Sequence, residues 1–146
     1  MKETLSTEEL AYLAGYFDGE GSISIHIRAN KGTSPSLSIA VSTGDKEVVE
    51  LFARTFGGSV YPVKPGKRTR RQIFIWTQAG NKGQAVLRLL LPFLKAKLYP
   101  AEEALKLTFL PSGTGRGRHG ISEEELILRQ QVAERVSAFN NRITIN

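Results

Sequence analysis

Cysteine is absent from this chain of 146 residues, and histidine occurs only as His26 and His119. The lack of cysteine excludes disulfides and thiolate metal sites, and two histidines are too few for a histidine-based zinc site. No apolar run approaches the ~18 residues of a transmembrane helix, and the N-terminus has no signal-peptide pattern. We therefore expect a soluble intracellular protein with no membrane partner, in an organelle or the bacterial cytoplasm.

The chain has fewer acidic than basic residues: 14 Asp and Glu compared with 20 Lys and Arg give a net charge of +6. A basic balance usually indicates a polyanionic partner, and nucleic acid is the commonest. The alternative is a soluble protein that is basic without such a partner. The length fits one domain with one core. We expect residues 1–146 to form it, with a core at 1–110, a flexible loop at 111–121 and a C-terminal helix and tail at 122–146.

Hydrophobic periodicity predicts the element order α-ββ-α-ββ-α-α-α. The helices are expected at residues 7–18, 46–56, 82–93, 99–110 and 123–138, and the strands at 22–28, 37–42, 59–63 and 72–77. Ser6 and Glu9 form a capping-box pattern before the first helix. Two αββ units of similar length indicate an α+β fold, in which helices back one four-stranded antiparallel sheet.

The end of the first helix reads LAGYFDGEG at residues 13–21, with glycines four residues apart. Ala11, Gly15 and Gly19 share one helix face and form a smooth stripe, so another helix can approach closely. Because no other segment offers a matching stripe, the simplest partner is the same helix of a second copy, related by a two-fold axis. The expected homodimer interface consists of Ala11, Leu13, Gly15, Tyr16 and Gly19.

Glu20 stands at the foot of this helix, where it would meet its own copy across the two-fold axis. Two carboxylates in one place are unfavourable unless a cation lies between them. Oxygen ligands without sulfur or imidazole suit Mg²⁺ or a similar hard ion, with Ca²⁺ or Mn²⁺ as substitutes. The alternative is a helix that ends in Gly-Glu-Gly only because turns favour glycine.

The motif LAGYFDGEG resembles the signature of the LAGLIDADG homing endonucleases in residue types and spacing. GSI at 21–23 follows it as in that family, LPFLKAK at 91–97 is similar to the family's PFLK-x-K segment, and FN at 139–140 also fits. The resemblance implies the family's αββαββα fold, with a four-stranded antiparallel DNA-binding saddle. Since one motif is present rather than two, it also implies a homodimer.

The resemblance further implies a site-specific endonuclease that makes metal-dependent double-strand breaks in a long near-palindromic DNA site, like intron- or intein-encoded mobility enzymes. Glu20 matches the family's metal-binding acid, and the Gly19 carbonyl is expected to be a second metal ligand. Asp18 matches an earlier acid and is expected to hold the helix end. The expected catalytic residues are Glu20, Lys97, which would stabilise charge on the phosphate or lower the pKa of a water, and Thr43, which stands where a glutamine often follows the second strand.

Alternation in the first two strands predicts an apolar inner face and a polar, acid-free outer face. Such a face can lie along the DNA major groove, where Arg28 would pair with guanine. A merely solvated sheet face would also alternate. The DNA-binding residues expected from this hairpin are Ser22, Ser24, His26, Arg28, Asn30, Lys31, Ser36 and Ser38.

The turn at residues 64–71 contains five cations and no acid. It is either a solvated charge run or, at the tip of a hairpin, a phosphate-binding element. The expected phosphate contacts are Lys64, Lys67, Arg68, Arg70 and Arg71. In the next strand Ile73 and Ile75 are expected to face the core. This phase directs Gln72, Phe74, Trp76 and Gln78 outward, where the two glutamines would pair with adenine.

The competing hypothesis is a non-catalytic nucleic-acid binder on the same scaffold, either an intron-splicing maturase or a transcription regulator. Glu20 and Lys97 favour the enzyme, whereas the departure from glutamine at Thr43 favours the binder. A weaker third hypothesis is an RNA-binding structural protein.

Overall fold

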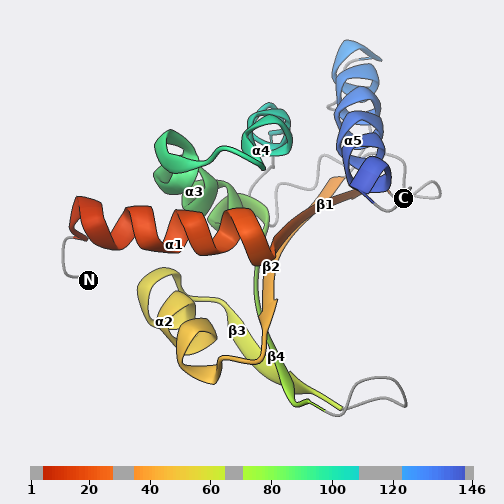
Figure 1. The fold of residues 1–146 in the computed structure, drawn as a ribbon. Helices are drawn as coiled ribbons and strands as arrows, with labels where there is room; N and C mark the ends of the chain where they lie inside the picture. Colours follow the sequence, from red (N-terminus) through yellow and green to blue (C-terminus); the bar gives the residue numbers. More distant parts are fainter. Residues whose placement is uncertain (1–4, 28–34, 65–70, 109–122, 144–146) are drawn as a thin grey trace.

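The computed structural model describes residues 5–27, 35–64, 71–108 and 123–143 (Figure 1). Its elements are α1 (Thr7–Glu20), β1 (Gly21–Ile27), β2 (Pro35–Thr43), α2 (Lys46–Phe56), β3 (Ser59–Val63), β4 (Ile73–Ala79), α3 (Gly80–Leu90), the 3₁₀ turn η1 (Leu91–Phe93), α4 (Leu98–Ala104) and α5 (Glu123–Ile143). The expected fold class is confirmed: the chain has an α+β fold with one four-stranded antiparallel sheet. The expected loop at 111–121 lies outside the described residues.

The sheet has the strand order β1-β2-β4-β3, so β2 and β4 are central and the other two strands form the edges. Figure 1 shows α1, α2 and α3 on one side of the sheet, and α5 beside the end of β1. We call the side that packs on α1, α2 and α3 the inner face, and the opposite side the outer face.

Local sequence signals begin α1 and end α2 as expected, whereas α1 continues to Glu20, two residues beyond its expected end. The Ser6 hydroxyl accepts from the Glu9 backbone N–H at 3.1 Å, and the Glu9 carboxylate accepts from the Ser6 N–H at 3.0 Å, which completes the capping box. Helix α2 ends at Gly57 and Gly58, whose φ angles of 75° and 95° favour glycine. A Cβ atom at Gly58 would also collide with the Thr77 carbonyl of β4.

The core lies between the inner face and the helices. Its largest fully buried side chains include Leu13 and Phe17 of α1, Phe52 of α2, Leu87 of α3 and Trp76 of β4. The rings of Phe52 and Trp76 stack with centroids 4.9 Å apart. This pair fastens α2 to the central strand β4 and thereby fixes which side of the sheet is free.

The predicted phase of β4 is wrong. Trp76 is 0% exposed, and its indole N–H donates to the Gly57 carbonyl at 2.7 Å. Gln78 likewise points to the helix side, because its amide donates to the Phe56 carbonyl at 3.2 Å. Phe74 packs against the core, so Ile73 and Ile75 occupy the outer face instead. Both alternating sets of residues in IFIW at 73–76 are apolar, so the alternation does not predict which set faces the core. The buried indole N–H bond and the larger apolar area of the indole place Trp76 on the core side.

Polar contacts join the C-terminal helices to each other and to β1, in addition to their buried apolar residues in the core. Glu103 of α4, only 5% exposed, accepts from Arg135 of α5 at 3.1 Å and from Lys106 at 2.7 Å. Asn140 of α5 donates to the Ile23 carbonyl of β1 at 3.0 Å. These contacts hold α5 beside β1. Among the described residues, no helix is both long and apolar enough to cross a membrane.

The third and fourth helices are shorter than predicted. Helix α3 gives way to the 3₁₀ turn η1 at Leu91, next to Pro92, which has no backbone N–H to continue an α-helix. Helix α4 ends at Ala104, where the buried Gln84 amide of α3 donates to the Ala104 carbonyl at 3.0 Å and to the Leu107 carbonyl at 2.8 Å. A side chain from another helix therefore satisfies carbonyls that a longer helix would have bonded internally.

The burial of Trp76 predicts unequal effects for two neighbouring substitutions. Trp76→Phe removes the donor to Gly57 and some core volume, so it should lower the free energy of unfolding by about 1–3 kcal/mol. Ile75→Val, on the outer face, should cost less than about 0.5 kcal/mol. Urea unfolding followed by circular dichroism measures both. An equal loss in the two variants would contradict the assigned phase.

Candidate active site

Asp18 anchors the foot of α1 to a segment far along the chain. Its carboxylate accepts three backbone N–H bonds from the loop after η1, from Lys95 at 2.8 Å, Ala96 at 3.0 Å and Lys97 at 2.9 Å. Asp18 is therefore structural, as predicted, and holds the helix end against the LPFLKAK segment. Burial by itself raises the pKa of the Asp18 carboxyl, but the three N–H bonds and the Lys97 charge outweigh it and lower the pKa below its usual value.

The same contact places Lys97 beside the end of α1. Its Nζ atom donates to the Asp18 carbonyl at 2.8 Å. Burial lowers the pKa of the Lys97 ammonium, while the negative charges of Asp18 and Glu20 raise it in part. The bond to Asp18 therefore brings Lys97 to the end of the helix that carries Glu20, although 77 positions separate the two residues in the sequence.

Thr43, the third expected catalytic residue, ends β2 within a small hydrogen-bonded network. Its hydroxyl lies 2.7 Å from the Tyr16 hydroxyl and accepts from the Asp45 N–H at 3.2 Å. Tyr16 donates to the Asp45 carboxylate at 3.1 Å, so the shorter contact is a bond from Thr43 to Tyr16. Burial raises the pKa of Tyr16, and the charges of Asp45 and Glu20 add to the rise, against the Thr43 bond, so Tyr16 stays a donor at neutral pH. Sequence reasoning missed Asp45 as a partner.

The foot of α1 thus lies beside the Lys97 ammonium group, and Tyr16, one turn before Glu20, contacts the Thr43 hydroxyl. Glu20 itself is exposed at the last position of the helix. The carbonyls of a last helical turn have no intrahelical partner, which leaves the Gly19 carbonyl as a second hard oxygen next to Glu20. This donor set suits a hard divalent cation. In the described part of the chain, no three Asp, Glu or His side chains gather around a common point.

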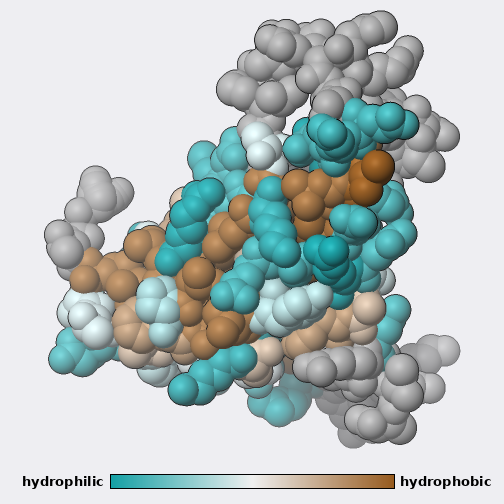
Figure 2. All heavy atoms as spheres, turned by 90° about the horizontal axis from the view of Figure 1, so that it is seen from above, coloured by the Kyte–Doolittle hydropathy of each residue, from teal (hydrophilic) through white to brown (hydrophobic). Residues whose placement is uncertain are grey.

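The stripe on α1 is open to a partner. Ala11, Gly15 and Gly19 are exposed, and a Cβ atom built at either glycine meets nothing within 4 Å. Tyr12 beside the stripe is 53% exposed. In the view from above, hydrophobic residues form a band at the surface, bordered by hydrophilic side chains (Figure 2). Leu13, expected in the interface, is only 1% exposed; the structure places it in the protomer core instead.

The polar outer face of β1 and β2 has the predicted phase. Ser24 pairs with Ser38 and His26 with Ser36, while the isoleucines between them are buried. Ser22, Ser36 and His26 are exposed, and Ser24 and Ser38 are half-buried. Six further expected DNA contacts lie outside the described residues, namely Arg28, Asn30, Lys31, Lys67, Arg68 and Arg70.

The ends of β3 and β4 carry the remaining expected contacts. Lys64 and Arg71 are exposed there. The Gln72 amide donates to the Val63 carbonyl at 2.8 Å and to its neighbour Ile73 at 3.0 Å, which ties it to the backbone of the hairpin. Gln78 was expected on the DNA face, but it bonds to α2 on the opposite side. The strand register instead assigns Thr77 to the outer face, a residue that sequence reasoning missed because it followed the wrong phase.

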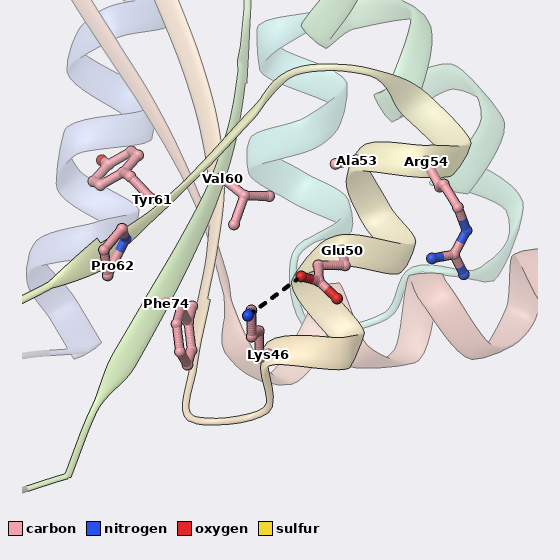
Figure 3. A pocket seen from close by; sticks show the side chains of 8 residues that line it. All are labelled: Lys46, Glu50, Ala53, Arg54, Val60, Tyr61, Pro62 and Phe74. Atoms are coloured by element: carbon pink, nitrogen blue, oxygen red, sulfur yellow. Dashed lines mark ion pairs between the residues drawn. The ribbon is translucent and has the colours of Figure 1, made fainter.

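A cavity of about 660 Å³ lies between α2 and the β3–β4 hairpin (Figure 3). Its lining residues are Lys46, Glu50, Ala53, Arg54, Val60, Tyr61, Pro62 and Phe74. The one ion pair drawn there joins Lys46 and Glu50 across 3.9 Å with both side chains largely exposed, a geometry that contributes little stability. The cavity is lined by α2, β3 and β4 and not by the foot of α1, so it lies apart from the candidate site.

The lowered pKa of Asp18 predicts a pH-dependent stability. Because the folded value lies below the unfolded one of about 3.9, the contribution is complete above the unfolded pKa and is lost as the pH falls through the folded pKa. Asp18→Asn should therefore lower the free energy of unfolding at pH 7 by about 1–3 kcal/mol. Urea unfolding at pH 7 and at successively lower pH should show the two proteins converging in acid. Glu50→Gln, an exposed control, should show no such difference; a constant gap for Asp18→Asn would contradict the assignment.

Comparison with known proteins gives the fold and the family. Solved structures similar to the chain include the homing endonuclease I-CvuI in complex with its target, with a TM-score of 0.67, 19% identity and coverage of 90% of this chain and 82% of that one. Another is the archaeal intron-encoded homing endonuclease I-Vdi141I complexed with DNA, with a TM-score of 0.68, 16% identity and coverage of 90% and 84%. The I-LtrWI LAGLIDADG homing endonuclease bound to target DNA has a TM-score of 0.57 and 19% identity, and the match covers 92% of this chain and 46% of that one.

No curated protein sequence gives a match. The family model described as LAGLIDADG endonuclease matches residues 13–99, which is more than half of the chain. The matched span begins with the helix foot that carries Glu20 and includes the loop that carries Lys97, so the residues gathered by Asp18 all fall within it. The chain belongs to the LAGLIDADG endonuclease family.

Proposed function

We propose that this protein is a site-specific, metal-dependent DNA endonuclease that acts as a homodimer on a long near-palindromic site. The observation that carries the proposal is the cluster at the foot of α1, where Glu20 ends the helix that presents the open Ala11/Gly15/Gly19 stripe. A two-fold axis along this stripe would bring two copies of the cluster together over one DNA duplex. One copy per strand is the arrangement that a double-strand break requires.

The DNA partner is supported by charge and by the outer face. The chain carries +6, and the exposed Lys64 and Arg71 flank the sheet. A twisted antiparallel ribbon fits the major groove, and short hydroxyl side chains such as Ser22 and Ser36 can bond to base edges there. The complexes of I-CvuI and I-Vdi141I with DNA agree with this partner.

The residues at the helix foot fit phosphodiester hydrolysis. The Glu20 carboxylate and the Gly19 carbonyl would hold a divalent cation such as Mg²⁺, which when bound supplies charge neutralisation and an acidified water. Lys97 presents a positive charge beside them, fixed by the Asp18 carbonyl, and stabilises charge that develops on the phosphate. Its lowered pKa also eases proton exchange with a nearby water.

Thr43 has a defined hydrogen-bonding direction. Its proton is donated to Tyr16 and one lone pair accepts from Asp45, which leaves one lone pair for an incoming donor. The hydroxyl can therefore orient a water by accepting one of its hydrogens. A glutamine side chain has both a donor and an acceptor, so Thr43 would perform only part of that residue's task.

The second candidate function is a non-catalytic nucleic-acid binder, such as a maturase or transcription regulator. The engagement of Thr43 within the protomer favours it, because a hydroxyl already bonded to Tyr16 and Asp45 is also explained by structure alone. The two functions differ in one result: an enzyme cuts its bound site in Mg²⁺, whereas the binder only occupies it.

Glu20→Gln separates these functions. The variant keeps the shape of the side chain and removes its charge, so DNA binding without metal should stay equal or tighten, while cleavage in Mg²⁺ should fall by several orders of magnitude. A plasmid that carries the intron-less insertion site of the protein's own gene is the substrate, and linearisation is followed on gels. Glu50→Gln is the matched control and should cut normally. Full cleavage by Glu20→Gln would remove the catalytic role, and tight wild-type binding without any nicking in Mg²⁺ would favour the binder.

Gly15→Leu tests the homodimer. Nothing lies within 4 Å of a Cβ at Gly15, so leucine fits the single chain and also has a higher helix propensity by roughly 0.8 kcal/mol. We therefore expect a folded protein that sediments as a monomer where the wild type is a dimer. Glu47→Leu adds similar bulk at an exposed position of α2 and should remain dimeric. A monomeric wild type at micromolar concentration, or a dimeric Gly15→Leu variant, would contradict the interface.

A further inference from the structure

The two halves of the outer face of the sheet carry different kinds of side chain. Its β1–β2 half presents serine hydroxyls and His26, as described above. Its other half, on β4 and β3, presents mainly apolar groups. By register these are Ile73 opposite Val63, Ile75 opposite Tyr61, and Thr77 opposite Ser59. Neither half contains an acidic residue.

These apolar side chains are not part of the core. Tyr61 is 46% exposed, and Ile73, Ile75, Thr77 and Val63 are half-buried. Figure 3 shows Val60 directed toward α2, while Tyr61 points to the opposite side of the strand. A group of apolar side chains that remains accessible on one face of a basic protein commonly marks an interaction site.

Two features of this half favour DNA as its occupant. The patch continues without a break into the serine-rich half, since Thr77 pairs with Ala40 and Ile75 with Ser42 across β2 and β4. Exposed Lys64 and Arg71 lie at its end, which gives the phosphate-facing charge that a duplex requires. A protein partner with an apolar surface would not explain why cations and hydroxyl groups border the apolar side chains.

The major groove presents one apolar group to such a patch, the C5 methyl of thymine. Resting on the function proposed above, we propose that Ile75 and Thr77 read thymine methyls in each half-site, with Tyr61 beside them. Both residues lie on the central strand β4 and are flanked by strands on either side. The serine half reads hydrogen-bonding groups, so the two halves of the sheet recognise different chemistry in adjacent base pairs.

The test compares thymine with uracil, which lacks only the methyl group. Double-stranded sites are selected with the full-length protein from a random DNA library, and each thymine is then replaced singly by uracil. Losing one buried methyl should weaken wild-type binding about three- to fivefold at the contacted positions. Ile75→Ala or Thr77→Ser should bind thymine and uracil equally at one of these positions, with little change for the uracil site. Ser24→Ala, on the polar half, should retain the wild-type ratio.

Each outcome decides the proposal. If Ile75→Ala does not unfold like the wild type, it is set aside. Thr77→Ser, which removes a single methyl, then provides an independent measurement. If wild type binds selected sites but uracil costs nothing anywhere, the methyl assignment is wrong while the DNA function stands. If no DNA sequence is enriched, the proposed function fails and the methyl assignment fails with it.

Discussion

The carboxylate of Asp18 is the contact on which the candidate site depends. It joins the end of α1 to a loop more than 70 residues later by three backbone N–H bonds of 2.8–3.0 Å. Bonds to a charged acceptor are stronger than neutral ones and offset the cost of partial burial. Since the acceptor is one rigid carboxylate and the donors are backbone, the loop has little freedom to shift. The Lys97 ammonium then donates to the Asp18 backbone carbonyl. Asp18 thus holds both the backbone and the side chain of Lys97.

Asp18 and Glu20 are close in the sequence but differ in their contacts. Asp18 accepts three backbone N–H bonds and thereby anchors the helix end. Glu20, two residues later, is exposed, and its carboxylate is free of the anchoring task. Two separate acids avoid the competition that would arise if three N–H donors and a cation shared the oxygens of one carboxylate. In the proposed dimer, the intervening Gly19 would let the helix end lie close to its partner, and its carbonyl lies next to Glu20 in the chain.

The sequence predicts features whose cause is local. The capping box of Ser6 and Glu9, the stop at Gly57 and the phase of β1 each follow from residues within a few positions of one another. The phase of β4 does not, because residues 73–76 are all apolar and contacts with Phe52 and the Gly57 carbonyl select Trp76 for the core. The hydroxyl bonds of Tyr16 are not predictable from the sequence for the same reason, because its partners Thr43 and Asp45 lie 27 and 29 residues away.

The network of Tyr16, Thr43 and Asp45 also couples the proposed interface to the proposed chemistry. Tyr16 stands one turn before Glu20 on the same helix, so any movement of α1 against a second copy acts on both residues together. Tyr16 donates its proton to Asp45, which leaves its oxygen to accept the Thr43 proton. The free lone pair of Thr43 is therefore oriented by the position of α1. An assembled helix pair would fix α1, and with it the direction in which Thr43 can hold a water.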